Sequence, residues 1–221
     1  MSRIVSIIPG RGNSKGIPRK NLVELGDKPL IVHTIEQSLD SKLIDDTIVS
    51  TEDKTIKSIS ESNGATIIDR PKKLSSDTAT AESVIFHVLQ EIERKPDIVV
   101  LLQCTSPFRK RDDIDNQINH QLKYGYDSVF SVCRAKEFIW NEYLDSITYD
   151  YKNRIRRQNF PIYYKENGAI YTFKRSKFEE EKNRICGRKG IYIMDELSMI
   201  EIDEPKDLEW ARKVYNIIHD K

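Results

Sequence analysis

The sequence predicts an α/β fold of Rossmann-like type, in which a mostly parallel sheet is flanked by helices. Two observations support this prediction. Short β-branched runs, of the kind buried on both faces of a sheet, alternate with amphipathic segments through the first half of the chain. A loop rich in glycine and basic residues, "PGRGNSKGIPRKN", follows the first of these runs. Ligands of open α/β sheets bind beyond the carboxyl ends of the strands, so this loop stands where a ligand site is expected.

The predicted strands and helices of the first half follow one another in βαβ order. The strand-like runs are "IVSII" at 4–8, "DDTIVST" at 45–51, "ATIID" at 65–69 and "DIVVLLQ" at 97–103. Apolar residues near the 3.6-residue helical period predict helices around 30–39, 56–59 and 84–92. A further helix at 114–124 precedes a strand, "DSVFSVC", at 127–133. A parallel sheet with both faces covered follows from this order.

The pattern changes character at about residues 135–165, where aromatic and polar residues show little helical period. We interpret this segment as an excursion of loops and hairpins from a single domain that spans residues 1–221. Exposed aromatic residues often mark protein interfaces, so a smaller, protruding dimerisation arm is one interpretation, and a lid packed on its own domain is the other. Beyond it, we predict strands at 168–174 ("GAIYTFK") and 199–203 ("MIEID") and a closing helix at 207–218.

Composition and charge exclude several classes of partner. The 221-residue chain has 36 Lys and Arg against 35 Asp and Glu, a formal net charge of +1. No global positive field therefore draws nucleic acid, and any positive site must be local. Cys104, Cys133 and Cys186 lie far apart without zinc-type spacing, which favours reduced thiols and a cytoplasmic protein. No apolar run approaches the ~20 residues of a membrane span, so we expect no membrane partner.

The opening loop has the chemistry of a polyphosphate site. Glycines let a backbone approach an anion and point N–H groups toward it, and the loop contains Gly10, Gly12 and Gly16. Their spacing matches neither the dinucleotide motif GxGxxG nor the Walker A motif GxxxxGK[ST]. The alternative is a basic turn that is exposed to solvent. Charge-assisted bonds to an anion could come from Arg11, Lys15, Arg19 and Lys20, of which the last two are also open to simple solvation.

Six motifs in a fixed order share one family resemblance. The opening loop "IIPGRGNSKGIPRKN" is followed by "DRPKKLSSDTAT" from Asp69, "LLQCTSPFR" from Leu101, "RRQNFP" from Arg156, "ENGAIY" from Glu166 and "EIDEPKDL" from Glu201. Together they resemble the acylneuraminate cytidylyltransferases, the CMP-sialic acid synthetases. The usual signature of that family reads PARGGSKG(I/V)xxKN, from which this chain departs at Gly10 and Asn13. The resemblance covers nearly the whole chain.

The resemblance implies transfer of CMP from CTP to the anomeric hydroxyl of a nonulosonic acid, with release of pyrophosphate and with Mg²⁺ as cofactor. It also implies the fold of the nucleotide-diphospho-sugar transferases and a homodimer. The sugar oxygen attacks the α-phosphorus, so the protein mainly has to align two anions and stabilise charge on the leaving pyrophosphate. Two alternatives remain open, a 3-deoxy-manno-octulosonate cytidylyltransferase and a non-catalytic nucleotide-binding homologue.

The same resemblance implies a set of nucleotide-binding residues. Arg11 and Lys15 would bind the triphosphate, and Lys15 is the best candidate for stabilising charge in the transition state. The hydroxyls of "SSDTAT" would contact the base or ribose, or else cap the following helix. The implied nucleotide-binding residues are Gly10, Arg11, Gly12, Asn13, Ser14, Lys15, Asn21, Arg70, Asp77, Thr78 and Thr80, and the implied catalytic residues are Arg11, Lys15 and Asp203.

Sugar and metal contacts are implied further along the chain. Arg157 would hold the carboxylate of the sugar through its guanidinium fork, with Arg156 as the competing candidate, and in this family the partner subunit supplies part of the pocket. Residues at i and i+2 of a strand share a face, so Glu201 and Asp203 could hold one Mg²⁺, or Asp203 could serve the start of the next helix. The implied sugar-binding residues are Gln103, Thr105, Ser106, Arg157, Gln158 and Tyr171.

Overall fold

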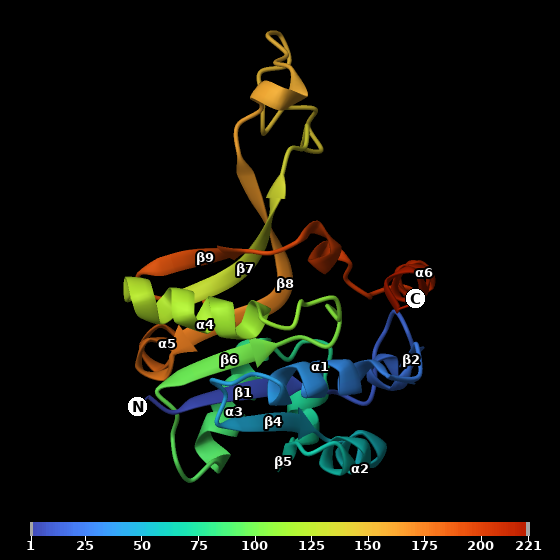
Figure 1. Cartoon of the computed structure of the whole chain (residues 1–221), viewed down its shortest axis with the longest axis vertical. Helices are drawn as coiled ribbons and strands as arrows, with labels where there is room; N and C mark the ends of the chain where they lie inside the picture. Colours follow the sequence, from blue (N-terminus) through green and yellow to red (C-terminus); the bar gives the residue numbers. More distant parts are fainter. Residues whose placement is uncertain (1, 220–221) are drawn as a thin grey trace.

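The computed structural model describes residues 2–219 and places a seven-stranded sheet between two layers of helices (Figure 1). The strands of this sheet are β1 (Ile4–Pro9), β4 (Asp46–Thr51), β5 (Thr66–Asp69), β6 (Ile98–Leu102), β7 (Ser128–Ala135), β8 (Tyr163–Lys174) and β9 (Lys189–Ile193); β2 (Glu24–Leu25) and β3 (Lys28–Pro29) form a separate small hairpin. The helices are α1 (Leu30–Leu39), α2 (Lys54–Ser62), α3 (Ala81–Glu91), α4 (Asp113–Tyr124), α5 (Arg175–Glu181) and α6 (Pro205–His219), with short 3-10 helices η1 (Lys20–Leu22), η2 (Lys72–Ser75), η3 (Arg157–Asn159) and η4 (Glu196–Met199).

The strand order is β5-β4-β1-β6-β8-β7-β9. The neighbours β5, β4, β1 and β6 are parallel, β8 is antiparallel to β6 and β7, and β9 is parallel to β7. The mostly parallel sheet predicted from the sequence is confirmed. The carboxyl ends of β1, β4, β5 and β6 lie at one edge of the sheet, where folds of this class bind their ligands.

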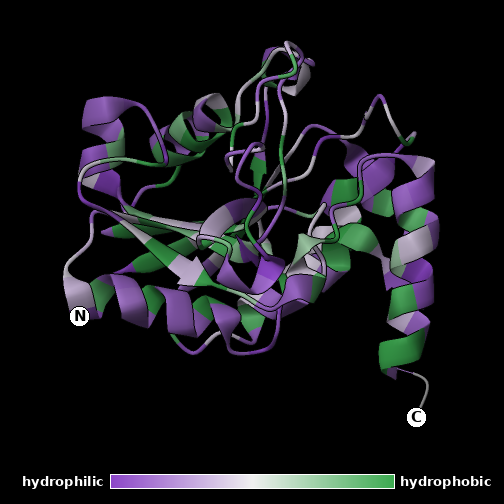
Figure 2. Ribbon diagram, turned by 90° about the horizontal axis from the view of Figure 1, so that it is seen from above, coloured by the Kyte–Doolittle hydropathy of each residue, from purple (hydrophilic) through white to green (hydrophobic). Residues whose placement is uncertain are grey.

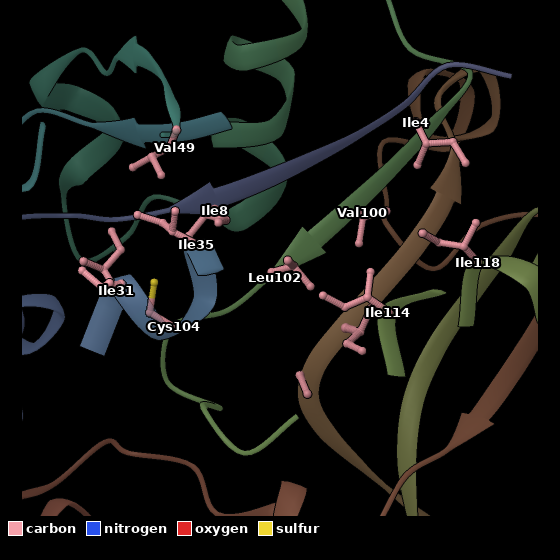
Figure 3. Packing of buried hydrophobic residues seen from close by; sticks show 14 of the residues in the cluster. Ile4, Ile8, Ile31, Ile35, Val49, Val100, Leu102, Cys104, Ile114 and Ile118 are labelled. Carbon is pink, nitrogen blue, oxygen red and sulfur yellow. The ribbon is translucent and has the colours of Figure 1, made fainter. Parts of the chain in front are cut away.

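Alternating side chains along β1 divide the core between the two faces of the sheet. Ile4 and Ile8 pack with residues of α1, α2 and α4 (Figure 3). Val5 and Ile7 pack on the opposite face with residues of α3 and α5. In Figure 2 the central strands are largely hydrophobic, whereas the surrounding helices mix hydrophobic and hydrophilic residues. The helices therefore cover the sheet with one apolar side each.

A third, smaller cluster lies beside the carboxyl edge and joins segments that are distant in the sequence. Ile17 of the basic loop packs with Ile202 and with Leu208 and Ala211 of α6. Ile17 is 6% exposed and Ile202 is fully buried. Burial of these two side chains brings the N-terminal loop against the segment that precedes the last helix.

The prediction of a strand at 199–203 is wrong. Residues 196–199 form η4, and among the described residues the segment 200–203 makes one backbone–backbone bond to the loop after β6, from the N–H of Ile202 to the carbonyl oxygen of Thr105 (2.8 Å). The N–H groups of Asp203 and Glu204 donate instead to the carboxylate of Asp207 in the first turn of α6. Helix capping thus takes the donors that a strand ladder would need.

Residues 136–162 form an arm between β7 and β8 that projects from the sheet (Figure 1). β7 and β8 extend as a pair into its base, where Ala135 lies opposite Tyr163. The arm contains η3 and a single bridge between Trp140 and Ser146. It exposes Tyr143, Leu144 and Ile147, which are 77%, 78% and 61% exposed. These side chains face solvent instead of covering the domain as a packed lid would.

Candidate active site

A cleft of about 320 Å³ lies at the carboxyl edge of the sheet. Pro9 at the end of β1, Leu101 on β6 and Val84 on α3 contribute to its walls. This volume is at the lower end of the range found for small-molecule sites, about 300–1,000 Å³. The predicted site residues that line it are Arg11, Ser14, Asn21, Arg70, Asp77, Thr80, Gln103, Thr105, Glu201 and Asp203.

The basic loop meets the acidic segment 201–203 along one side of the cleft. Nζ of Lys20 donates to Oδ1 of Asp203 (2.6 Å) and to the carbonyl oxygen of Ile202 (2.8 Å). A Cβ added to Gly16 would lie 2.1 Å from the carbonyl oxygen of Asp203, so only glycine allows this approach. Burial of Ile17 against Ile202 supports the same contact. The sequence left Lys20 open to solvation, whereas its side chain is only 12% exposed and lines the cleft.

Two glycines of the loop, Gly10 and Gly12, allow close packing with neighbouring segments. The N–H of Gly10 donates to the carbonyl oxygen of Ser50 (3.0 Å), and the N–H of Gly12 donates to Oε1 of Glu52 (2.8 Å). A Cβ on Gly12 would approach the Asp53 carboxylate at 2.8 Å. Protein acceptors therefore satisfy these two donors, so the N–H groups of Gly10 and Gly12 do not form part of the expected anion-binding nest.

Glu52 connects the two walls of the cleft, although it carries no role in the motifs. While Oε1 accepts from Gly12, Oε2 accepts from the hydroxyl of Ser75 (2.6 Å) at the end of η2. The same carboxylate is a favourable charge for the guanidinium of Arg70. Glu52 therefore holds the basic loop and the 70–80 segment in one arrangement.

Arg70 brings a largely buried cation to the cleft. It follows β5, is 6% exposed, and donates to the hydroxyl and carbonyl oxygens of Ser50. Burial lowers the pKa of its guanidinium, and the positive charge of Arg11 lowers it further. No carboxylate forms an ion pair with Arg70 among residues 2–219, so an anionic ligand in the cleft would relieve an electrostatic cost.

The 70–80 segment forms the opposite wall. Thr80 caps α3 by accepting the N–H of Ser83 (3.2 Å) and also lines the cleft, so the two roles considered for it coincide in space. Ser76 also lines the cleft, and its hydroxyl lies 3.2 Å from that of Thr78. Asp77 reaches across to the basic loop, with Oδ1 3.0 Å from Nη1 of Arg11 and Oδ2 3.1 Å from Nζ of Lys15.

Polar side chains from two segments converge beside Gly168 at the end of β6. A Cβ on Gly168 would lie 3.5 Å from Oε1 of both Gln103 and Glu201, and the φ of Gly168 is +66°. The hydroxyl of Thr105 donates to Oε1 of Glu201 (3.3 Å). Burial and the nearby charge of Asp203 raise the pKa of Glu201. Two acidic side chains thus share one wall, where a cation would offset their repulsion.

Arg109 stabilises the floor of the cleft, which we define as the backbone of Gln103 and Ala169 at the end of β6. Its position in "LLQCTSPFR" did not indicate this role. Its guanidinium donates to the carbonyl oxygens of Gln103 and Ala169 and to Oε1 of Gln37. The residue is 6% exposed, and burial lowers its pKa to about 10. Arg109 therefore fixes the backbone of Gln103, whose side chain lines the cleft.

Several of the implied residues lie outside the lining of the cleft. Ser106 is buried and donates to the carbonyl oxygen of Asn167 (3.3 Å). Tyr171 is 3% exposed in the core, where its hydroxyl donates to Glu166 and Arg184 lies over its ring. Arg157 and Gln158 are exposed on η3 of the arm. The remaining residues outside the lining are Gly10, Gly12, Asn13, Lys15 and Thr78.

Residues 2–219 contain no group of three or more His, Cys, Asp or Glu side chains arranged to hold a metal ion. Among the helices in that range, none combines the length and the apolar character required to cross a bilayer. All three cysteines are free and buried.

Comparison with known proteins identifies the family. A family model described as cytidylyltransferase matches residues 5–217. The N-acylneuraminate cytidylyltransferase of Escherichia coli O18:K1:H7 is 34% identical over 217 residues, which cover 95% of this chain and 51% of that protein. The pseudaminic acid cytidylyltransferase of Campylobacter jejuni serotype O:2 is 30% identical over 224 residues and 97% of each chain. This chain thus spans about half the length of the first relative and nearly all of the second.

Solved structures share the fold. A CMP:2-keto-3-deoxy-manno-octonic acid synthetase complexed with CTP superposes with a TM-score of 0.73 at 18% identity, over 99% of both chains. A 4-diphosphocytidyl-2C-methyl-D-erythritol synthase from Anaerococcus prevotii gives a TM-score of 0.68 at 15% identity, over 96% of this chain and 98% of that one. At these identities the similarity concerns the fold.

Proposed function

This chain belongs to the cytidylyltransferase family, and on that premise we propose that it transfers CMP from CTP to the anomeric hydroxyl of a nonulosonic acid, releasing pyrophosphate. The main observation in support of the proposal is that cationic and acidic side chains line the same cleft. Lys20 of the basic loop contacts Asp203 at 2.6 Å, and these two residues line the cleft together with Arg11 and Arg70. A nucleoside triphosphate needs this combination of positive charge and a place for a metal.

In the proposed reaction, each group of residues that lines the cleft has a distinct role. The anomeric oxygen attacks the α-phosphorus, the bond from that phosphorus to the bridging oxygen breaks, and negative charge grows on the leaving pyrophosphate. Arg11 and Lys15 neutralise this charge from the loop, and Lys20 adds a third cation close to Asp203. Arg70, Asn21 and Thr80 bind the nucleotide, and Gln103 and Thr105 position the acid at the end of β6. Alignment and electrostatic stabilisation are the main contributions of the protein.

We also propose that Glu201 and Asp203 hold Mg²⁺, because their chemistry suits this ion. Glu201 and Asp203 both line the cleft, and the charge of Asp203 contributes to the raised pKa of Glu201. Mg²⁺ typically takes one or two carboxylates and completes its shell with phosphate oxygens and water, so a pair of acidic residues is sufficient. When bound, the ion would supply positive charge next to the triphosphate.

We further propose that the arm mediates a homodimer and completes the site of the partner. The apolar side chains exposed at Tyr143, Leu144 and Ile147 are suited to an interface. Arg157 lies on the arm and does not reach the cleft of its own chain, which supports a role in the partner's sugar pocket. The cytoplasmic location drawn from the cysteines stays a prediction.

The proposed activity is tested by pyrophosphate release. The protein is incubated with CTP, Mg²⁺ and, in parallel, N-acetylneuraminate, legionaminate, pseudaminate or 3-deoxy-manno-octulosonate, with UTP and ATP as control nucleotides. We expect CTP-dependent release with at least one nine-carbon acid. Release only with the eight-carbon acid would support the 3-deoxy-manno-octulosonate alternative, and CTP binding without release with any acid would support the non-catalytic one.

A further inference from the structure

Asp77 pairs with the two cations that the proposed function assigns to the triphosphate. Its two carboxylate oxygens lie 3.0 Å from Nη1 of Arg11 and 3.1 Å from Nζ of Lys15. The side chain of Asp77 is 45% exposed and lines the cleft. These cations lower the pKa of Asp77 and keep the carboxylate ionised. In the free protein a negative side chain therefore stands beside the phosphate-binding groups.

An ionised carboxylate offers no hydrogen-bond donor to a phosphate and repels it. A triphosphate that binds Arg11 and Lys15 must therefore take the place of Asp77. Ion pairs this exposed are individually weak, so a ligand with several negative charges can displace them.

The surrounding wall allows Asp77 to leave without loss of the fold. Ser75 is held by Glu52 (2.6 Å) on one side, and Thr80 caps α3 through the N–H of Ser83 (3.2 Å) on the other. The Asp77 carboxylate itself bonds only to Arg11 and Lys15 among the described residues. By contrast, Asp53, which pairs with Arg19, also caps α2 through two backbone N–H groups. Asp77 is thus released more easily than Asp53.

We propose that Asp77 is an affinity-setting residue, an internal anion that occupies the triphosphate subsite until CTP displaces it. This inference rests on the proposed function. When pyrophosphate leaves, Asp77 pairs again with Arg11 and Lys15, so the same exchange favours product release. The cost of displacing Asp77 is included in the apparent affinity for every ligand that carries the β- and γ-phosphates.

The test compares the wild-type protein with Asp77→Asn by calorimetric titration at one fixed Mg²⁺ concentration, using CTP, pyrophosphate and cytidine. We expect Asp77→Asn to bind CTP and pyrophosphate about threefold to tenfold more tightly, as loss of two exposed ion pairs implies. Cytidine lacks phosphates, so its affinity should not change. Asp77→Glu keeps the carboxylate and should remain near wild type.

The control variant is Asp112→Asn, which changes the net charge equally at an exposed position outside the cleft lining. It should leave all three affinities unchanged. If the wild-type protein binds CTP but Asp77→Asn binds it equally or more weakly, the inference is wrong and the proposed function stands. Equal tightening for cytidine, or for Asp112→Asn, also overturns the inference. If the wild-type protein does not bind CTP, the proposed function fails together with it.

Discussion

Replacing Arg109 by Met tests whether a buried cation holds the floor of the cleft. The guanidinium donates twice to the carbonyl oxygen of Ala169 (2.9 and 3.0 Å), once to that of Gln103, and to Oε1 of Gln37 (2.8 Å). Arg109 is 6% exposed, so water does not readily replace these bonds. Methionine keeps an apolar stem but removes the guanidinium donors of all three acceptors, of which the carbonyl oxygen of Gln103 still accepts from the N–H of Ser106 (3.3 Å).

The expected loss follows from these contacts. A buried acceptor left unpaired costs about 1–3 kcal/mol. Gln103 retains its bond from Ser106, and the half-buried amide of Gln37 can turn toward water, so the carbonyl oxygen of Ala169 carries most of the cost. Burial disfavours the charged guanidinium, as its lowered pKa indicates, and removal of that charge returns part of the energy. We expect the free energy of unfolding to fall by about 1–3 kcal/mol.

Equilibrium urea unfolding of Arg109→Met measures this loss, with Lys110→Met as the control. Lys110 is the next residue in the chain and forms an exposed ion pair with Asp195, so its loss should leave the unfolding midpoint unchanged. Arg109→Lys retains the charge with fewer donors and should fall between the two. If Arg109→Met unfolds at the same urea concentration as Lys110→Met, the guanidinium does not stabilise the backbone at the end of β6.

Three further predictions concern other parts of the structure. Glu52→Ala should lose about 2 kcal/mol of unfolding free energy because Gly12 and Ser75 lose their shared acceptor. Glu52→Gln keeps an acceptor and should lose less than half of that free energy. Equal urea midpoints for the two variants would contradict this prediction. Burial lowers the pKa of His33 below its ordinary 6.5, so the unfolded chain binds the proton more readily than the folded one. The free energy of unfolding should therefore decline as the pH falls through 6.5 toward the lowered pKa. His33→Gln should flatten this part of the pH–stability profile, and an unchanged profile would exclude His33 as its source. Under the proposed function, Asp203→Asn should raise the Mg²⁺ concentration for half-maximal pyrophosphate release at least tenfold, whereas an unchanged Mg²⁺ dependence would remove Asp203 from the metal site.

The repeated β-branched runs made the parallel half of the sheet predictable. β1, β4 and β6 are buried on both faces, so their apolar character is continuous, whereas β5 at the edge of the sheet is partly exposed. α5 and β9 were missed because their patterns are short. α5 has seven residues and buries only Phe178, and β9 has five residues with Gly190 among them.

Only some of the residues that line the cleft could be predicted from the sequence, because tertiary contacts determine which side chains reach it. The motifs indicated Arg70, Gln103 and the acidic pair 201–203, and the structure brings these to one cleft. The hydrogen bonds that Glu52 accepts from Gly12 and Ser75 could not be predicted from the sequence, because these partners lie 40 and 23 positions away from it. Similarly, Tyr171 belongs to a motif but faces the core, because strand register sets its direction.

A crystal structure of the protein with CTP and Mg²⁺ is the most direct measurement of whether the basic loop and the acidic segment serve one ligand. We predict that the triphosphate lies between Arg11 and Asp203, with Asp77 turned away from Arg11 and Lys15 and the base near Arg70 and Thr80. A triphosphate bound away from these residues, or one that contacts the loop while Asp203 and Glu201 stay remote from it, would contradict the proposed site.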